Sequence, residues 1–273
     1  MAETARPDRR TRRVRVIGVG PGDPDQVTLE AVAAMRSVDF FVVTDKAPRR
    51  GADSGSDDPL VIARERLLAR HLDHPPRLVV VADPPRDRSA VGTADRPGYE
   101  RAVGDWHDAR AEAWAAALRA NDGDAGFSAG FLVWGDPAFY DSTIRVLDRV
   151  AELLPVEVDV IPGISSLQLL AARHRIVLHE VGRPVHVTTG RALAEALAHG
   201  QENVVVMLNR DLSPLADPAL ADWRVWWGAN LGTPSEALVA GRVGDVLGEI
   251  EAARRTVKDA AGWVMDVYLL RRT

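Results

Sequence analysis

The sequence contains no cysteine, and this absence excludes disulfide bonds, thiolate metal ligands and cysteine nucleophiles. No apolar run approaches the roughly 20 residues of a membrane-spanning helix, and no signal-peptide pattern is present, so we expect a cytoplasmic protein without membrane segments. The 34 basic residues are outnumbered by 39 acidic ones, so the charge gives no reason to expect nucleic-acid binding. The seven histidines lack zinc-hydrolase spacing, and we expect no metal site.

The chain is long enough for two domains, because 273 residues correspond to about two units of roughly 150 residues each. In the first part, short apolar runs alternate with segments of helical spacing, which predicts a parallel sheet with helices on its faces. After about residue 165, apolar segments recur with fewer clear helices between them, which indicates an α/β domain with a partly antiparallel sheet. We therefore predict a disordered basic tail (residues 1–12), an N-terminal α/β domain (13–155) and a C-terminal α/β domain (156–273).

The expected elements of the first domain can be placed individually. The strands are expected at Val14–Ile17, Val38–Lys46, Arg77–Pro85, Phe127–Pro137 and Val156–Gly163, and the helices at Thr28–Ser37, Leu60–His71, Tyr99–Asn121 and Tyr140–Leu153. Two polar stretches, residues 47–59 and 84–98, are expected to be long loops that act as lids or are disordered.

The loop after the first strand, in "VRVIGVGPGDPDQVT", is rich in glycine and proline. A dinucleotide fingerprint has a third glycine where this chain has Asp23, whose charge would repel phosphate. Pro21 and Pro24 also remove backbone N–H donors that a pyrophosphate would need. A loop with few donors and no surplus positive charge suits a ligand that is not a phosphate, and S-adenosylmethionine fits, although a purely structural turn stays open.

Two later loops repeat this design at the ends of the fourth and fifth strands. In "VWGDPAFYDST", Gly135 permits close approach of the backbone, and Asp136 could bind a ribose or amino group or cap the next helix. In "VIPGISS", Ser165 and Ser166 offer hydroxyl groups at a helix start. Ligands of parallel sheets bind beyond the carboxyl ends of the strands, so three such loops in strand order indicate a binding site.

These segments resemble the tetrapyrrole methylases, the S-adenosylmethionine-dependent C-methyltransferases of cobalamin and sirohaem biosynthesis. The resemblance covers essentially Arg13 to Arg271 and rests on "GVGPGDPDQVT", "WGDPAFYDST", "VIPGISS", "NVVVML" and "EALVAG". It implies two α/β domains with the cofactor in the cleft between them, usually in a homodimer. Longer matches, such as "ADPPRD" and "VWWGANLGTP", are most similar to the deacetylating members, which implies methylation of precorrin-5 at ring carbon C-1 with loss of the acetyl group as acetate.

The resemblance also implies which residues form the site. The cofactor is expected to contact Pro21, Gly135, Asp136, Phe139, Ser165, Ser166, Met207 and Gly241. Asp45, at the end of the second strand, resembles a position that faces the substrate, and it is our candidate for a base or a group that directs a proton; an N-cap, or a bond to Lys46 or an arginine, stays open. His179, or alternatively His174, is the candidate for directing the water of deacetylation.

The substrate implied by the resemblance is a tetrapyrrole with many carboxylates, so an arginine-rich rim is expected. The candidates are Arg86, Arg88, Arg173 and Arg175, with Arg183 as a further one; each taken singly is best interpreted as a solvated surface arginine, and the hypothesis concerns the cluster.

Three other functions stay open at this point. Methylation at another ring position, without deacetylation, would use the same cofactor loops. A dinucleotide-dependent reductase would have to bind NAD(P)H, which Asp23 and the prolines disfavour. A tetrapyrrole carrier without catalytic activity would have no use for complete cofactor loops.

Overall fold

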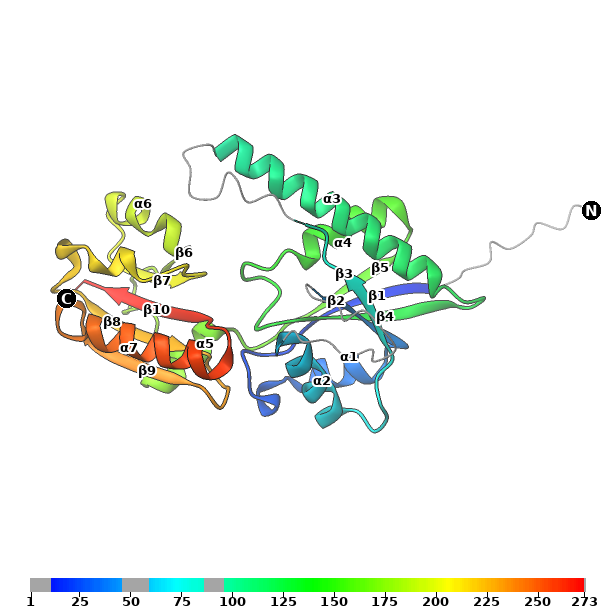
Figure 1. The fold of residues 1–273 in the computed structure, drawn as a ribbon, viewed down its shortest axis with the longest axis horizontal. Coiled ribbons are helices and arrows are strands. Elements are labelled where there is room, and N and C mark those ends of the chain that lie inside the picture. The colour runs from blue at the N-terminus through cyan, green and yellow to red at the C-terminus, as the bar shows by residue number, and fades with distance from the viewer. Residues whose placement is uncertain (1–10, 46–58, 86–95, 273) are drawn as a thin grey trace, which may run out of the picture. The chain divides into compact units, whose positions relative to one another are not determined.

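The computed structural model describes residues 11–45, 59–85 and 96–272 (Figure 1). The chain divides into two compact units. Unit 1 comprises Met1–Val19 and Val27–Gly163, and unit 2 comprises Gly20–Gln26 and Ile164–Thr273. The loop that follows the first strand therefore belongs to the second unit, although the residues on both sides of it belong to the first.

Unit 1 contains a five-stranded parallel sheet in the order β3-β2-β4-β1-β5. Its strands are β1 (Thr11–Gly18), β2 (Phe40–Asp45), β3 (Leu78–Ala82), β4 (Gly126–Val133) and β5 (Glu157–Ile161). The central strand β1 is buried on both faces, as its run of branched residues predicts. Val14 and Val16 pack into one cluster with Trp114, whereas Ile17 packs into another with Met35.

The helices of unit 1 follow the strands in alternation. They are α1 (Leu29–Arg36), α2 (Pro59–His71), α3 (Arg96–Ala120) and α4 (Thr143–Leu153). Thr28 caps α1, because its Oγ1 accepts a hydrogen bond from the N–H of Ala31 at 3.1 Å. Residues of α3 and α4 cover one face of the sheet, and residues of α1 and α2 pack on the other. This arrangement leaves the carboxyl ends of the strands to the connecting loops.

Unit 2 contains a mixed sheet in the order β6-β7-β10-β8-β9, in which only β6 and β7 run parallel. Its strands are β6 (His186–Thr189), β7 (Asn203–Met207), β8 (Arg224–Ala229), β9 (Ala237–Arg242) and β10 (Asp266–Arg271). Its helices are α5 (Ser166–His174), α6 (Leu193–Ala198) and α7 (Val243–Ala261), and short 3-10 turns include η1 (Pro24–Gln26) and η3 (Ser213–Ala216). One face of the sheet packs against α7 and the other against α5.

The predicted fold class, with a parallel first sheet and a mixed second sheet, is confirmed. The division between the units differs from the predicted one at residue 155, since β5 pairs with β1 and stays in unit 1. Strand β1 also begins at Thr11, within the predicted tail, of which residues 1–10 lie outside the described part of the chain.

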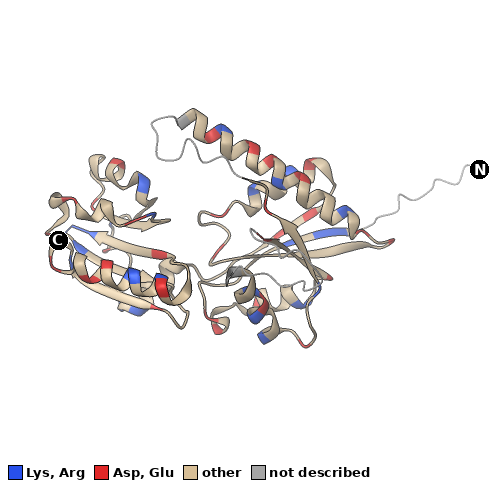
Figure 2. Cartoon of the chain, viewed as in Figure 1, with Lys and Arg blue, Asp and Glu red and all other residues tan. Residues whose placement is uncertain are grey.

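No described helix is both long and apolar enough to cross a membrane. Acidic and basic residues are interspersed along α3 and α7, so neither helix carries charge of a single sign (Figure 2).

Candidate functional site

Three glycines allow the loops that follow the central strands of unit 1 to pack closely against each other. A Cβ atom added to Gly18 would lie 2.6 Å from the backbone nitrogen of Gly163, and one added to Gly163 would lie 2.2 Å from the carbonyl oxygen of Gly135. Gly135 also has a φ angle of 67°, which few residues other than glycine adopt. Because no side chain fits between them, the main chains of the three loops pack directly against each other at the carboxyl edge of the sheet.

Asp136 fixes two of these loops through main-chain contacts. Its Oδ2 accepts a hydrogen bond from the N–H of Gly163 at 2.9 Å, and its Oδ1 accepts one from the N–H of Ala138 at 2.8 Å. Both carboxylate oxygens therefore bind backbone groups of the loops, whereas the N-cap of the next helix, α4, is Ser142, so Asp136 does not cap that helix. The prediction that Asp136 contacts the cofactor stays untested.

The loop that begins with Gly135 continues into two exposed aromatic residues. Phe139 is 37% exposed and Tyr140 is 42% exposed, and Tyr140 has a φ angle of 52°. Partial burial nevertheless raises the pKa of the Tyr140 hydroxyl above its ordinary value. Large exposed apolar side chains in a loop at a strand end are typical of a binding surface. The cofactor contact of Phe139 stays a prediction.

Asp45, the candidate base, is the last residue of β2 and is only 2% exposed. Its carbonyl oxygen accepts a hydrogen bond from the N–H of Asp83, which follows β3 directly. The carboxyl ends of neighbouring parallel strands therefore bring Asp45 and Asp83 to the same edge of the sheet. This is the edge at which ligands of parallel sheets bind.

In unit 2, the glycine- and proline-rich loop over residues 20–26 packs against the turn over 231–233. A Cβ atom on Gly22 would lie 2.6 Å from the carbonyl oxygen of Leu231, and one on Gly232 would lie 2.9 Å from the N–H nitrogen of Asp23. Asp23 closes its own loop, because its Oδ1 accepts a hydrogen bond from the N–H of Asp25 at 2.9 Å. Glycines are needed here for packing between two loops, whereas a dinucleotide loop needs them to approach a pyrophosphate. Pro21 lies half-buried within this loop.

The two candidate serines occupy different positions at the start of α5. Ser165 is the N-cap and is 3% exposed, and it forms a reciprocal capping box with Gln168. Its Oγ lies 3.0 Å from Oε1 of Gln168, so its hydroxyl group already has a partner. Ser166 is half-buried, and its hydroxyl group has no hydrogen-bond partner among the described residues. Of the two, Ser166 has the hydroxyl that is available to a ligand.

Met207 ends β7, and the next residue leaves the sheet in an unusual conformation. Leu208 has a φ angle of 54° and is 58% exposed. A leucine in the left-handed region is strained, and an exposed leucine at a strand end is a candidate ligand contact. The side chain of Met207 packs against the cluster under α5, which leaves Leu208 as the more exposed of the two. Reasoning from the motif "NVVVML" selected Met207 and missed Leu208.

The structure does not bring Gly241 or His179 to this edge of unit 2. Both β7 and β8 pair with β10, and their registers place Met207 at the same height in the sheet as Gly228. Gly228 in turn pairs with Leu238 of β9. Gly241 lies three residues further along β9, about 10 Å towards the opposite edge. His179 precedes Glu180, which pairs with Arg271 at the end of β10, again at the opposite edge. His174 has a structural bond, since its Nε2 lies 2.9 Å from the carbonyl oxygen of Trp227.

Two of the candidate arginines of unit 2, Arg173 and Arg175, lie at the C-terminal end of α5, whereas Arg183 is exposed in the segment before β6. Nε of Arg173 donates to both carboxylate oxygens of Glu236, at 2.8 and 3.1 Å, so its charge is already paired. Arg175 is the C-cap of the helix, with a φ angle of 54°, and is exposed. Arg86 and Arg88 lie outside the described residues.

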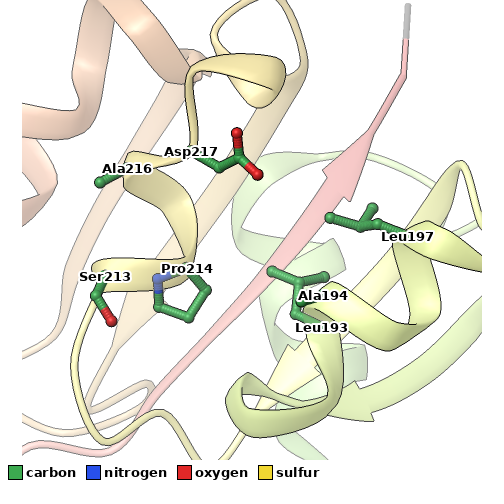
Figure 3. A pocket seen from close by; sticks show the side chains of 7 residues that line it. All are labelled: Leu193, Ala194, Leu197, Ser213, Pro214, Ala216 and Asp217. Atoms are coloured by element: carbon green, nitrogen blue, oxygen red, sulfur yellow. The ribbon is translucent and has the colours of Figure 1, made fainter.

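A pocket of about 380 Å³ lies elsewhere in unit 2, between α6 and η3 (Figure 3). It is lined by Leu193, Ala194, Leu197, Ser213, Pro214, Ala216 and Asp217. Asp217 already accepts a hydrogen bond from the N–H of Ala219. None of the predicted site residues lines this pocket, and we assign no ligand to it.

Each unit offers groups that suit S-adenosylmethionine, which needs no phosphate-binding loop. Unit 1 has the exposed apolar surface of Phe139, and unit 2 has the exposed Leu208 and the hydroxyl group of Ser166. Sequence reasoning also missed the turn from Asn230 to Thr233, against which the loop over residues 20–26 packs. The glycine and threonine that follow the strand in "WWGANLGT" were the pattern that could have identified it.

The chain is thus an α/β protein of two units, the first of which has glycine-rich loops at the carboxyl ends of a parallel sheet, where ligands of such sheets bind. The model of the family Tetrapyrrole (Corrin/Porphyrin) Methylases matches residues 13–247. This chain therefore belongs to the tetrapyrrole methylase family, and the predicted family, with the S-adenosylmethionine dependence of its methylases, is confirmed.

Two curated relatives come from Sinorhizobium sp. One, named precorrin-6A synthase [deacetylating], is 38% identical over 266 residues, which cover 96% of this chain and 95% of the relative. The other, named precorrin-2 C(20)-methyltransferase, is 29% identical over 214 residues, which cover 77% of this chain and 78% of that relative. This chain is thus a homologue of methyltransferases of cobalamin biosynthesis.

Two solved structures are similar in fold. The cobalamin synthesis related protein CobF from Corynebacterium diphtheriae has a TM-score of 0.77 and 33% identity, with 96% of this chain and 98% of that chain covered. Uroporphyrin-III C-methyltransferase from Thermus thermophilus, in complex with S-adenosylhomocysteine, has a TM-score of 0.55 and 19% identity, with 95% and 92% covered. The second likeness shows the fold alone.

Proposed function

We propose that this chain is a precorrin-6A synthase of the deacetylating type, which methylates precorrin-5 at C-1 and releases the acetyl group as acetate. The observation that carries the proposal is the 38% identity to the relative of that name, extending over 96% of this chain and 95% of the relative. Identity over nearly the whole length of both proteins supports a shared substrate as well as a shared fold. The non-deacetylating relative is less similar and covers less of the chain.

For the cofactor, we propose contacts from both units. Gly135 and Phe139 of unit 1 would contribute backbone and aromatic surface, with Asp136 shaping their loop. In unit 2, Pro21, Ser166 and the segment from Met207 to Leu208 would contribute the remaining contacts. The cofactor cleft between the two domains stays a prediction, as do the cofactor contacts of Ser165 and Gly241.

S-adenosylmethionine, when bound, supplies an electrophilic methyl group and leaves as a neutral thioether. The work of the protein in the methyl transfer is therefore to align the attacking ring carbon, which is a matter of positioning. Deacetylation requires water at the acetyl carbonyl and a group that takes up a proton. We assign this role to Asp45, whose buried carboxyl group lies at the ligand-binding edge of unit 1. His179 lies at the edge of unit 2 remote from Met207, which gives it no support as the second catalytic group.

The proposal is tested by anaerobic turnover of precorrin-5 with S-adenosylmethionine, in which S-adenosylhomocysteine and acetate are quantified together. Equal amounts of the two products are expected. S-adenosylhomocysteine without acetate would retain the methyltransferase and overturn the deacetylating assignment. Neither product, from a preparation that binds the cofactor by calorimetry, would show that precorrin-5 is not the substrate.

The homodimer and the cytoplasmic location stay predictions from the sequence. Sedimentation equilibrium of the purified chain tests the first, and fractionation of the producing cells tests the second. A monomer at micromolar concentration would contradict the predicted assembly.

A further inference from the structure

A cluster of polar and aromatic side chains lies at the carboxyl edge of β2 and β3, next to Asp45. Its members are Thr44, Asp83, Trp106, Arg110 and Trp114, and we call them the Arg110 cluster. Three of them lie on α3 at intervals of four residues, a spacing that places side chains on one face of a helix. The cluster thus joins α3 to the strand ends, at the edge where ligands of parallel sheets bind.

Arg110 is held in one orientation by contacts on several sides. Its Nε donates to Oδ1 of Asp83 at 2.7 Å, and its Cζ lies 4.1 Å from the ring centroid of Trp106 and 5.5 Å from that of Trp114. The two partners of the ion pair are 13% and 10% exposed. Stacking on the face of tryptophan stabilises a guanidinium group and fixes its plane.

The two tryptophans are themselves anchored to the strand ends. Nε1 of Trp114 donates to Oγ1 of Thr44 at 3.2 Å, and Nε1 of Trp106 donates to the carbonyl oxygen of Pro84 at 3.2 Å. The orientation of the guanidinium group is therefore determined by α3, β2 and the segment after β3 together. A surface arginine that ended in solvent would need none of these contacts.

The two Nη atoms of Arg110 remain available. Among the described residues they donate no hydrogen bond, and neither is a buried atom left without a partner, so they keep contact with solvent. A guanidinium group whose Nε is bound still presents parallel donors that match the two oxygens of a carboxylate. Because the side chain is already immobilised, binding costs little further conformational entropy.

We propose that Arg110 binds a peripheral carboxylate of the tetrapyrrole substrate through its Nη atoms. This inference rests on the proposed function, since it concerns the substrate of that same site. Asp83 offsets the positive charge of Arg110. Recognition of the substrate carboxylate therefore depends on the two parallel Nη donors, and on the shielding of the guanidinium group from water by Trp106, more than on net charge. Arg110 is then a specificity residue of unit 1, next to the strand that ends in Asp45.

The test uses Arg110→Lys, which keeps a positive charge beside Asp83 but removes the two parallel Nη donors. We expect the KM for precorrin-5 to rise about tenfold or more, the effect of losing charge-assisted hydrogen bonds, with kcat within about twofold. The Kd for S-adenosylmethionine and the Tm are expected to stay close to those of the wild type. Arg101→Lys, an exposed arginine nearer the N-terminal end of α3, is the matched control and should leave all four quantities unchanged.

An unchanged KM in a folded Arg110→Lys variant would overturn the inference, as would a parallel loss of cofactor affinity, which indicates a structural role. Inactivity of the wild type would contradict the proposed function separately. In that case the inference is tested with uroporphyrin III, a stable polycarboxylate tetrapyrrole, whose binding is measured by quenching of tryptophan fluorescence. Weaker binding to Arg110→Lys than to the wild type would support the inference. Equal affinity for the two proteins, or no binding to either, would overturn it.

Discussion

Asp136 and Gly163 are joined by a hydrogen bond of 2.9 Å between the carboxylate Oδ2 and the backbone N–H, which ties the loop after β4 to the loop after β5. The same carboxylate accepts from Ala138 through its other oxygen. One side chain thus sets the relative position of two loops that the family resemblance assigns to the cofactor. Its contribution to binding is expected to act through loop geometry.

Replacing Asp136 with alanine should therefore weaken cofactor binding without removing a direct contact. We expect the Kd for S-adenosylmethionine to rise about tenfold or more, with a loss of about 1–3 kcal/mol in the free energy of unfolding from the unpaired N–H groups. Calorimetric titration and urea denaturation measure the two quantities. A variant that binds the cofactor as tightly as the wild type would show that these loops do not form the cofactor site.

Substitution of Gly163 with alanine should disrupt the packing of the three loops. The new Cβ would lie 2.2 Å from the carbonyl oxygen of Gly135, and this backbone atom cannot move away cheaply. We expect a loss of more than about 2 kcal/mol in unfolding free energy, in the range of severe overpacking.

Gly248→Ala is the matched control for this substitution, because nothing lies within 4 Å of its added Cβ. Gly248 is inside α7, where alanine should stabilise the protein by about 0.5–1 kcal/mol. Urea denaturation of both variants measures the contrast. Equal stability of the two would mean that the loop contact is looser than described.

The sequence predicted the sheets of both units because each strand is a short apolar run bounded by glycine, proline or a helix start. The edge strand β5 was recognised as a strand but assigned to the wrong side of the domain boundary, since pairing with β1 depends on tertiary contacts. The loop over residues 20–26 belongs to unit 2 for the same reason, because contacts with the turn over residues 231–233 are not visible in local sequence.

The location of candidate residues at strand ends was predictable where the direction of the strand was known. In a parallel sheet all carboxyl ends share one edge, so Asp45, Gly135 and Asp136 were correctly expected at strand ends. In a mixed sheet the ends alternate, and a motif does not reveal which way its strand runs. Gly241 consequently lies away from Met207. His179 lies in the connection before β6, and the ion pair between Asp83 and Arg110 joins residues 27 positions apart, so neither position could be inferred from local sequence.

A buried ion pair in unit 2 predicts a strong effect on stability. Nε of Arg254 donates to Oδ2 of Asp266 at 2.9 Å, and the side chain of Asp266 is 1% exposed. Arg254→Met would leave this carboxylate buried without its cation, at a cost of about 3–5 kcal/mol. Adding Asp266→Asn removes the uncompensated charge and should recover part of the lost unfolding free energy. Urea denaturation of the single and double variants measures this, and a double variant no more stable than Arg254→Met would contradict the electrostatic explanation.

Tyr268 predicts how stability depends on pH. It is 1% exposed, and burial, together with the nearby charge of Asp266, raises the pKa of its hydroxyl well above the ordinary value. In the unfolded chain this group loses its proton near pH of about 10, whereas the native state keeps it. The native state then binds more protons than the unfolded state, so stability should fall as the pH rises above about 10, by up to about 1.4 kcal/mol per pH unit. Below that range this tyrosine contributes no pH dependence.

Tyr268→Phe isolates this contribution. The hydroxyl oxygen is buried and has no hydrogen-bond partner among the described residues, so its removal should change the unfolding free energy at neutral pH by no more than about 1 kcal/mol, and in the stabilising direction. Above about pH 10 the free energy of unfolding of the wild type should fall, and the variant should lack this contribution to the fall. The difference in unfolding free energy between the two proteins should therefore widen as the pH increases. Urea denaturation of both proteins between about pH 8 and pH 11 measures that difference. Parallel curves across this range would show that Tyr268 ionises as readily in the folded protein as in the unfolded chain.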